Sequence, residues 1–230
     1  MIFNSAWSVP RNANALADYL NIEDFPALVA HFLYNQVHPD SPLDEDSAPP
    51  PTYDCAITNP HLCKFSIYPS AIATFYAPSD ISGRGGMWQE FIWATPSWRN
   101  GPAHYDCIFV ETDPNAPGML DLHVTCVHLL FSFKFDGKTY PCALVDWFKP
   151  VSKDPDELTS MWVIQPEFHA DRVREQSVVH LDTIVWVAHQ IGVYGVDPLP
   201  AELQFTKSLD ALEAYYVNKY IDHHSHEIAF

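Results

Sequence analysis

The sequence predicts an α+β fold in which N-terminal helices precede a small barrel or curled antiparallel sheet and one helix follows it. Apolar residues recur at helical spacing within residues 12–38. Residues 65–187 instead contain several short segments rich in β-branched and aromatic residues, separated by turn signals. The last stretch of the chain again has helical periodicity. At 230 residues, the chain is long enough to bury a sizeable core around such a sheet.

Two short helices are predicted in the N-terminal segment, residues 1–39. Ala13, Leu16 and Leu20 recur at helical spacing in the first of them. Asp24 is a suitable N-cap for the second helix, because Pro26 follows in the first turn, where its missing N–H costs little. A proline at position 39 ends this helix.

Residues 40–62 are predicted to form an acidic, proline-rich linker. The stretch DSPLDEDSAPPPTYD, residues 40–54, has three consecutive prolines and four acidic residues among its first seven. This composition resists both helix and sheet. We therefore expect a domain boundary here, with residues 63–230 forming a β-rich domain that ends in a helix.

Strands are predicted in chain order along this second domain. Asp136 and Gly137 form a two-residue turn that joins two long strands into a hairpin. Residues 178–187 are expected to form a strand followed by a helical turn, and Ser208 to cap a helix over residues 208–219. The remaining β-like segments are residues 65–76, 87–95, 104–111, 120–135, 138–151 and 161–165.

The excess of acidic residues indicates which kinds of partner the chain can bind. Twelve basic residues stand against 29 acidic ones, which gives a formal net charge of −17. No cluster of Lys and Arg is present to neutralise phosphates, so the isolated chain is not expected to bind nucleic acid. A protein or a basic peptide is the expected partner. No apolar run approaches the ~20 residues of a membrane span, so no membrane partner is expected.

No complete catalytic set is evident. Cys142 with His180 and Asp182 supplies a nucleophile, a base and an acid. However, Cys142 lies inside an apolar strand, which favours a core cysteine over a reactive thiolate. We therefore expect neither an enzyme nor a cofactor.

Two groups of side chains are candidate sites. The tail residues His223, His224 and His226 are weak candidates for a divalent metal, and a polar end of the chain is the favoured explanation for them. The second group is an aromatic edge, and either core packing or a cage that holds a methylated ammonium by cation–π attraction accounts for it. The residues of this aromatic edge are Trp88, Trp93, Asp146, Trp147 and Trp162.

Several long phrases of the sequence resemble one family. The run AIATFYAPSDISGRGGMWQEFIWATPSWRNGPAHYDCIFVET is similar to the C-terminal region of Plavaka-type proteins, from fungal transposons related to the Kyakuja-Dileera-Zisupton group. So are YPCALVDWF, MWVIQPEF, VVHLDTIVWVAHQIGVYG, SLDALEAYYVNKYIDHHSHEIAF, PRNANALADYL and ALVAHFLYNQVHPD. The order of strands also looks like a bromo-adjacent-homology or Tudor-like barrel, with CALVDWF in the centre and MWVIQPEF as its partner.

The resemblance implies a module without catalysis, because the catalytic acidic residues of such transposases are expected upstream of this region. It implies an intracellular, nuclear protein that takes part in protein interaction or chromatin association. Two alternatives stay open: a DNA-associated accessory domain of a transposase, and an inert remnant.

Overall fold

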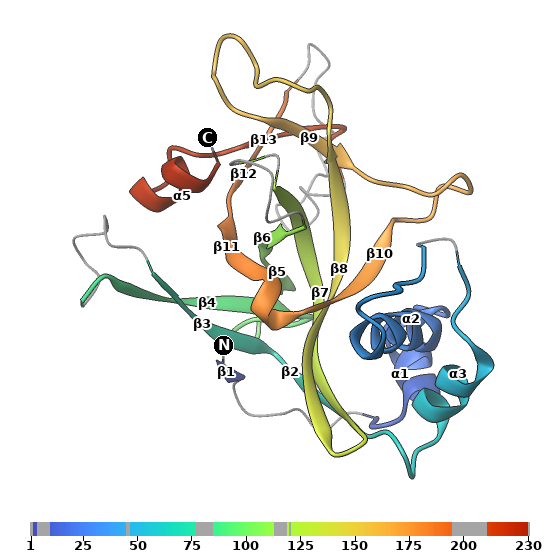
Figure 1. The fold of residues 1–230 in the computed structure, drawn as a ribbon. Helices are drawn as coiled ribbons and strands as arrows, with labels where there is room; N and C mark the ends of the chain where they lie inside the picture. The colour runs from blue at the N-terminus through green and yellow to red at the C-terminus, as the bar shows by residue number, and fades with distance from the viewer. Residues whose placement is uncertain are drawn as a thin grey trace.

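The computed structural model describes residues 2–3, 10–44, 47–76, 85–112, 119, 121–194 and 211–229. It has the predicted α+β architecture of N-terminal helices, a β-rich body and a C-terminal helix (Figure 1). None of the described helices is long and apolar enough to cross a bilayer.

The two predicted N-terminal helices are present as α1 (Ala13–Leu20) and α2 (Phe25–Val37). The side chain of Asn12 caps α1 by accepting a hydrogen bond of 2.9 Å from the Ala15 N–H. Asp24 occupies the N-cap position of α2, but its side chain makes no capping hydrogen bond. The start of α2 therefore relies on the proline in its first turn and on burial of its apolar face.

A third helix, α3 (Pro51–Thr58), corrects the expectation that the whole of residues 40–62 resists regular structure. The last of the three consecutive prolines is the first residue of this helix, where a proline has no hydrogen bond to lose. Burial of Ile57 between the helices and the sheet stabilises α3. The division of the chain into two domains stays a prediction.

Seven antiparallel strands form a nearly closed barrel. Their order is β11-β6-β7-β8-β9-β13-β12, and only His189 separates β11 from β12 along the chain, so the two ends of the order meet. The strands are β6 (Cys107–Glu111), β7 (Leu122–Phe135), β8 (Lys138–Pro150), β9 (Val163–Pro166), β11 (Ile184–Ala188), β12 (Gln190–Gly192) and β13 (Tyr215–Val217).

The longest strands, β7 and β8, form the predicted hairpin. Its turn is Asp136-Gly137, and both residues have positive φ, 47° and 77°, as a two-residue hairpin turn requires. Two more strands widen this part of the sheet: β2 (Phe65–Tyr68) pairs with β7, and β10 (Gln176–His180) pairs with β8. A single 3₁₀ turn (Leu181–Thr183) connects β10 to β11, in agreement with the predicted strand and helical turn.

A second sheet of four strands has the order β1-β3-β4-β5. Its centre is the hairpin of β3 (Ser70–Tyr76) and β4 (Met87–Thr95), flanked by the short strands β1 (Ile2–Phe3) and β5 (His104–Tyr105). This hairpin extends away from the barrel, on the side opposite the three N-terminal helices (Figure 1).

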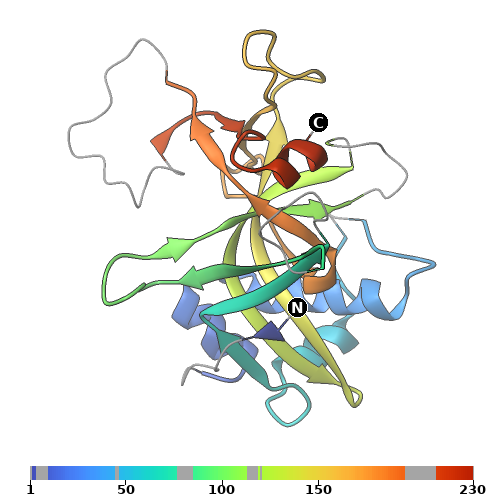
Figure 2. The same cartoon turned by 90° about the vertical axis from the view of Figure 1, so that its left-hand side faces the viewer.

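Buried side chains form two clusters, one on each face of the β7–β8 hairpin. Leu130, Ala143 and Val145 belong to the larger cluster, which joins side chains of the barrel strands to those of β3 and β4. Phe131, Cys142 and Leu144 belong to the other cluster, which packs against α1, α2 and α3. Neighbouring residues thus serve different cores, because successive side chains of a strand point to opposite faces. Figure 2 shows the helices behind this hairpin.

The end of the chain differs from the prediction. Tyr215 and Tyr216, expected on a helix over residues 208–219, belong to strand β13, and Ser208 and Leu209 lie outside the described residues. The C-terminal helix is α5 (His223–Ile228), capped by Asp222, whose carboxylate accepts a hydrogen bond of 2.6 Å from the Ser225 N–H. Pairing of β13 with both β9 and β12 overrides the weak helical periodicity.

Candidate functional site

The structure does not bring the five residues of the predicted aromatic edge together. Trp88 and Trp93 are five positions apart on β4, so their side chains lie on opposite faces of the second sheet. Trp88 packs against the larger core, whereas Trp93 belongs to the outer face. The two residues therefore cannot bind the same ligand from one surface.

Asp146 and Trp147 are separated in the same way, as consecutive residues of β8. Asp146 accepts a hydrogen bond of 2.6 Å from Gln176 and lies 3.7 Å from the ring nitrogen of His128. Burial alone would raise the pKa of Asp146, but hydrogen bonds from His128 and Gln176 lower it below its usual value. Trp147 donates to Ser177 over 2.7 Å on the other face, so its ring is already held within the sheet.

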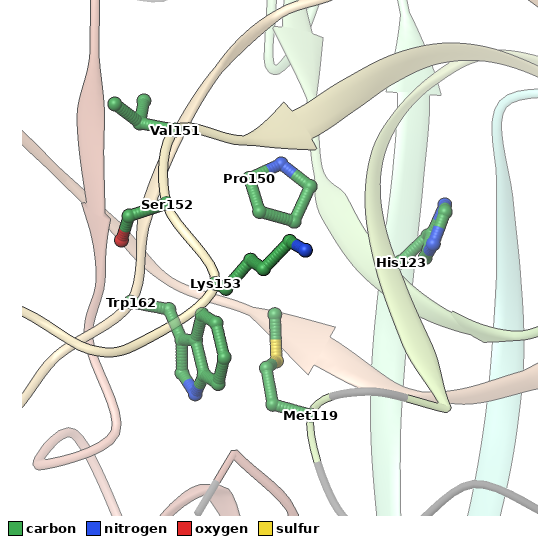
Figure 3. Close-up of a pocket in the computed structure, with 7 residues that line it drawn as sticks. All are labelled: Met119, His123, Pro150, Val151, Ser152, Lys153 and Trp162. Atoms are coloured by element: carbon green, nitrogen blue, oxygen red, sulfur yellow. The ribbon is translucent and has the colours of Figure 1, made fainter.

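Trp162 lines a cavity of about 650 Å³ at the end of β8 (Figure 3). Its side chain is only 7% exposed, and its indole N–H has no hydrogen-bond partner among the described residues. Trp147 is not among the lining residues, but its indole lies 5.8 Å from the ring of His123, which is one of them. The full lining comprises Met119, His123, Pro150, Val151, Ser152, Lys153 and Trp162.

The composition of this cavity does not favour a methylated ammonium. Lys153 extends into it toward Pro150 and His123 (Figure 3). A cage for a cation combines several aromatic faces with carboxylates, and the described lining residues offer one indole and no carboxylate. A cationic ligand would meet the ammonium of Lys153 instead.

The outer face of the four-stranded sheet is a broader candidate surface. Cross-strand pairs place Ile72 opposite Phe91 and Tyr76 opposite Met87, and residues directly opposite one another share a face. The exposed fractions of Tyr76 and Phe91 are 67% and 49%. Trp93 and Ile72 are half-buried on the same face, and Ile2 of β1 extends it beside Ile72. We call this surface, made of Ile2, Ile72, Tyr76, Met87, Phe91 and Trp93, the outer apolar face.

A row of rings continues the outer apolar face across β4 toward β5. The ring of Phe91 is stacked on Trp93 at 6.0 Å, and Trp93 meets Trp98 edge-on at 6.2 Å. Trp98 in turn lies 5.2 Å from the ring of His104, and the guanidinium of Arg99 lies 4.4 Å above its indole. Rings that support one another in this way are held in fixed positions, as recognition surfaces require.

Asp106 fixes the end of this row. One carboxylate oxygen accepts a hydrogen bond of 2.7 Å from the backbone N–H of Trp93, and the other lies 2.8 Å from Nε2 of His104. These contacts connect β4 to the junction between β5 and β6. Asp106 therefore holds Trp93 against the barrel with a half-buried carboxylate and with its backbone N–H, which donates to the Trp93 carbonyl over 3.0 Å.

The candidate nucleophile is placed against a histidine but sealed in the core. The register of β8 and β10 sets Cys142 directly opposite His180, and Asp182 lies 3.5 Å from the His180 ring. Cys142 is fully buried, and burial raises the pKa of its thiol well above the usual value. A thiol in this state is protonated and out of contact with solvent, which is the opposite of what a nucleophile needs.

The three histidines of the tail lie on α5 and differ in their ring partners, although His223 and His224 both lie 3.5 Å from the carboxylate of Glu227. His224 packs edge-on against Trp186 at 4.3 Å, while His226 is stacked on Tyr220 at 5.8 Å. Within the part of the chain that the structure describes, no three metal-ligating side chains gather in one place.

Sequence reasoning selected Trp93 but missed its neighbours on the same face. In the segment MWQEFIWAT, both alternating sets contain large apolar residues, so alternation alone does not indicate which set faces solvent. The pairing of Phe91 with Ile72 and of Met87 with Tyr76 is a product of the register of β3 and β4. A search for apolar residues on both faces of a predicted hairpin would have found this surface.

Comparison of this chain with models of known protein families, with curated proteins and with solved structures finds no match. The resemblance to the C-terminal region of Plavaka-type proteins accordingly stays a prediction.

Proposed function

We propose that this chain is a non-catalytic protein-interaction module that binds a basic partner segment through the outer apolar face. The observation that carries the proposal is the exposure of Tyr76, Met87 and Phe91 on one face of the β3–β4 hairpin, where the polar pair Thr74 and Gln89 lies between Phe91 and the other two. Large apolar side chains that are exposed together among polar residues mark interaction sites on folded proteins.

Charge argues for the nature of the partner. With a net charge of −17, two copies of the chain repel one another, whereas a segment rich in Lys and Arg is attracted. Apolar residues in the same segment would then cover the exposed rings. The ligand class is therefore a basic peptide or protein segment that carries aliphatic or aromatic anchors.

The proposal is tested by binding of the purified chain to a peptide array at near-physiological salt. The array holds Lys- and Arg-rich peptides with apolar anchors, acidic peptides with the same anchors, and duplex DNA. We expect capture of the basic peptides and weakening of about tenfold or more on Phe91→Ala, as for an anchor at the centre of an interface.

A matched control exists elsewhere on the surface. Phe168 has the same exposed fraction as Phe91, 49%, but lies on another part of the molecule under the guanidinium of Arg174. Phe168→Ala should leave binding unchanged. Equal losses in the two variants, or no capture of any basic peptide, would overturn the proposal. Capture of duplex DNA instead would support the DNA-associated alternative.

A further inference from the structure

Two of the five cysteines lie directly opposite one another across the barrel wall. The register of β6 and β7 pairs Cys107 with Cys126. Two backbone hydrogen bonds at the ends of this ladder show which pairs are hydrogen-bonded: the Val127 N–H donates to the Asp106 carbonyl, and the Thr112 N–H donates to the Asp121 carbonyl. Hydrogen-bonded pairs alternate with non-hydrogen-bonded pairs in an antiparallel ladder, and Cys107–Cys126 is the pair next to Asp106–Val127. Cys107 and Cys126 therefore form a non-hydrogen-bonded pair.

Such a pair has the geometry that a disulfide needs. Opposite residues in non-hydrogen-bonded positions have Cα atoms about 4.5 Å apart and side chains on the same face. Disulfides span Cα separations of about 4.4–6.8 Å. The two thiols also contact one another, because a side-chain hydrogen bond joins Cys126 to Cys107, and both cysteines are free.

The two sulfur atoms differ in access. Cys126 is half-buried, whereas Cys107 is buried in the larger core. A small oxidant can reach Cys126 first, and Cys107 is then the only thiol directly opposite it. Of the other cysteines, Cys55 is exposed on α3, Cys63 is buried in the cluster that packs against the helices, and Cys142 is paired with His180.

We infer that Cys107 and Cys126 are a modification site, a cross-strand dithiol that a hydroperoxide oxidises to a disulfide. The Cys126 sulfur attacks the peroxide, the O–O bond breaks, and a sulfenic acid forms with release of one alcohol or water. The Cys107 sulfur then attacks the sulfenic sulfur, the S–S bond forms, and water leaves. The dithiol loses two electrons and the peroxide gains them.

This oxidation is expected to be slow. The side-chain hydrogen bond with Cys126, together with burial, raises the pKa of the Cys107 thiol. This disfavours the thiolate of Cys107. The extent of oxidation at the end of the reaction is therefore a better readout than its rate.

The test uses the full chain, which is treated with hydrogen peroxide, denatured, alkylated with N-ethylmaleimide and digested with trypsin. No Lys or Arg lies between Arg99 and Lys134, so both cysteines fall in the peptide of residues 100–134, which contains no other cysteine. We expect this peptide to lose the mass of two hydrogens and to carry no alkyl group. Reduction before alkylation should restore two alkyl groups.

Two variants separate this outcome from general oxidation. In Cys126→Ser, Cys107 should be alkylated after the same treatment, and circular dichroism checks that the variant is folded. In Cys55→Ser, which removes the exposed thiol, the disulfide should form as before. Alkylation of both Cys107 and Cys126 in the parent protein, under conditions that oxidise Cys55, would overturn the inference.

Discussion

The two long hairpins of this protein, β7–β8 and β3–β4, carry apolar side chains on both faces, yet their surroundings differ. One face of β7–β8 packs in the larger core, and the other packs against α1, α2 and α3. One face of β3–β4 contributes Ala71, Ala73 and Phe75 to the larger core, while its other face is the outer apolar face. The comparison shows that a hairpin with apolar side chains on both faces is a core element where helices cover its second face. It is a candidate docking surface where the side chains of that face stay exposed.

The sharpest test of this comparison replaces one phenylalanine on each hairpin. Phe131 is fully buried on β7, with the ring of Phe25 from α2 at 5.5 Å, so Phe131→Ala should lower the free energy of unfolding by about 3–5 kcal/mol. Phe91→Ala on the outer apolar face should cost about 1 kcal/mol or less. Urea unfolding of both variants measures the difference, and similar losses would show that the outer apolar face is part of the core.

A second test concerns how each hairpin is attached. β7 and β8 lie within the ladder of barrel strands, whereas β4 is connected to the β5–β6 junction through the backbone N–H and the carboxylate of Asp106. Asp106→Ala leaves the Trp93 N–H without its acceptor, so we expect a loss of about 2 kcal/mol by chemical denaturation. Asp106→Asn keeps an acceptor oxygen and should retain most of the stability that the alanine variant loses. An unchanged stability of the alanine variant would mean that the attachment does not depend on this side chain.

A third test addresses the helices that cover β7–β8. The Asn12 side chain caps α1 through Ala15, and its removal in Asn12→Ala should destabilise the protein by about 1 kcal/mol. Asn12→Asp, which keeps the acceptor, is the matched control and should retain the parent stability. If the alanine variant unfolds at the same urea concentration as the parent, the packing of α1 does not depend on its cap.

The smallest expected effect is a pH dependence of stability that distinguishes the two faces of β4. Burial raises the pKa of Glu90, on the inner face, to about 7 from a usual 4.5, and the charges of Asp222 and Asp106 add to the increase. Between pH 4.5 and about 7, Glu90 keeps its proton in the folded state and has lost it in the unfolded state. The contribution of Glu90 to the free energy of unfolding is therefore full below pH 4.5 and is lost as the pH rises through about 7. Glu90→Gln should therefore be more stable than the parent at pH 8, by about 0.5 kcal/mol after solvent screening, and similar to it at pH 4.

The control for this pH effect is one residue away. Gln89 is exposed on the opposite face of β4, so Gln89→Glu adds a solvated carboxylate and should not change the pH dependence of the unfolding midpoint. If the two variants gave the same pH profile, the two faces of β4 would not differ in burial.

Local chemistry made much of the fold predictable. Asp136 and Gly137 suit a tight turn, so the β7–β8 hairpin follows from them and from the β-branched and aromatic residues on either side. The segment MWQEFIWAT forms a strand with the predicted bounds. Helix α3 was missed because its stability comes from packing of Ile57 against distant residues, which composition does not reveal.

The candidate site was less predictable, because it depends on which faces are covered. The four tryptophans of the predicted aromatic edge lie in four different environments. Trp88 packs against the larger core and Trp93 belongs to the outer apolar face, whereas Trp147 is held within the sheet and Trp162 lines the cavity. The register of β3 and β4 places Phe91 next to Ile72, and the register of β6 and β7 places Cys107 next to Cys126. Neither neighbour relation can be read from spacing along the chain, because cross-strand contacts depend on a pairing that the whole sheet sets.

The sequence by itself determined the α+β class, most of the strands, the tight hairpin turn and the acidic net charge. These properties follow from local conformational preferences and from composition, which need no knowledge of distant contacts. Only the tertiary structure decided that helices cover β7–β8, that the outer face of β3–β4 stays exposed, and that two cysteines meet across the barrel wall. These depend on which surfaces segments far apart in the chain bury together, since burial of apolar area is a property of the assembled fold.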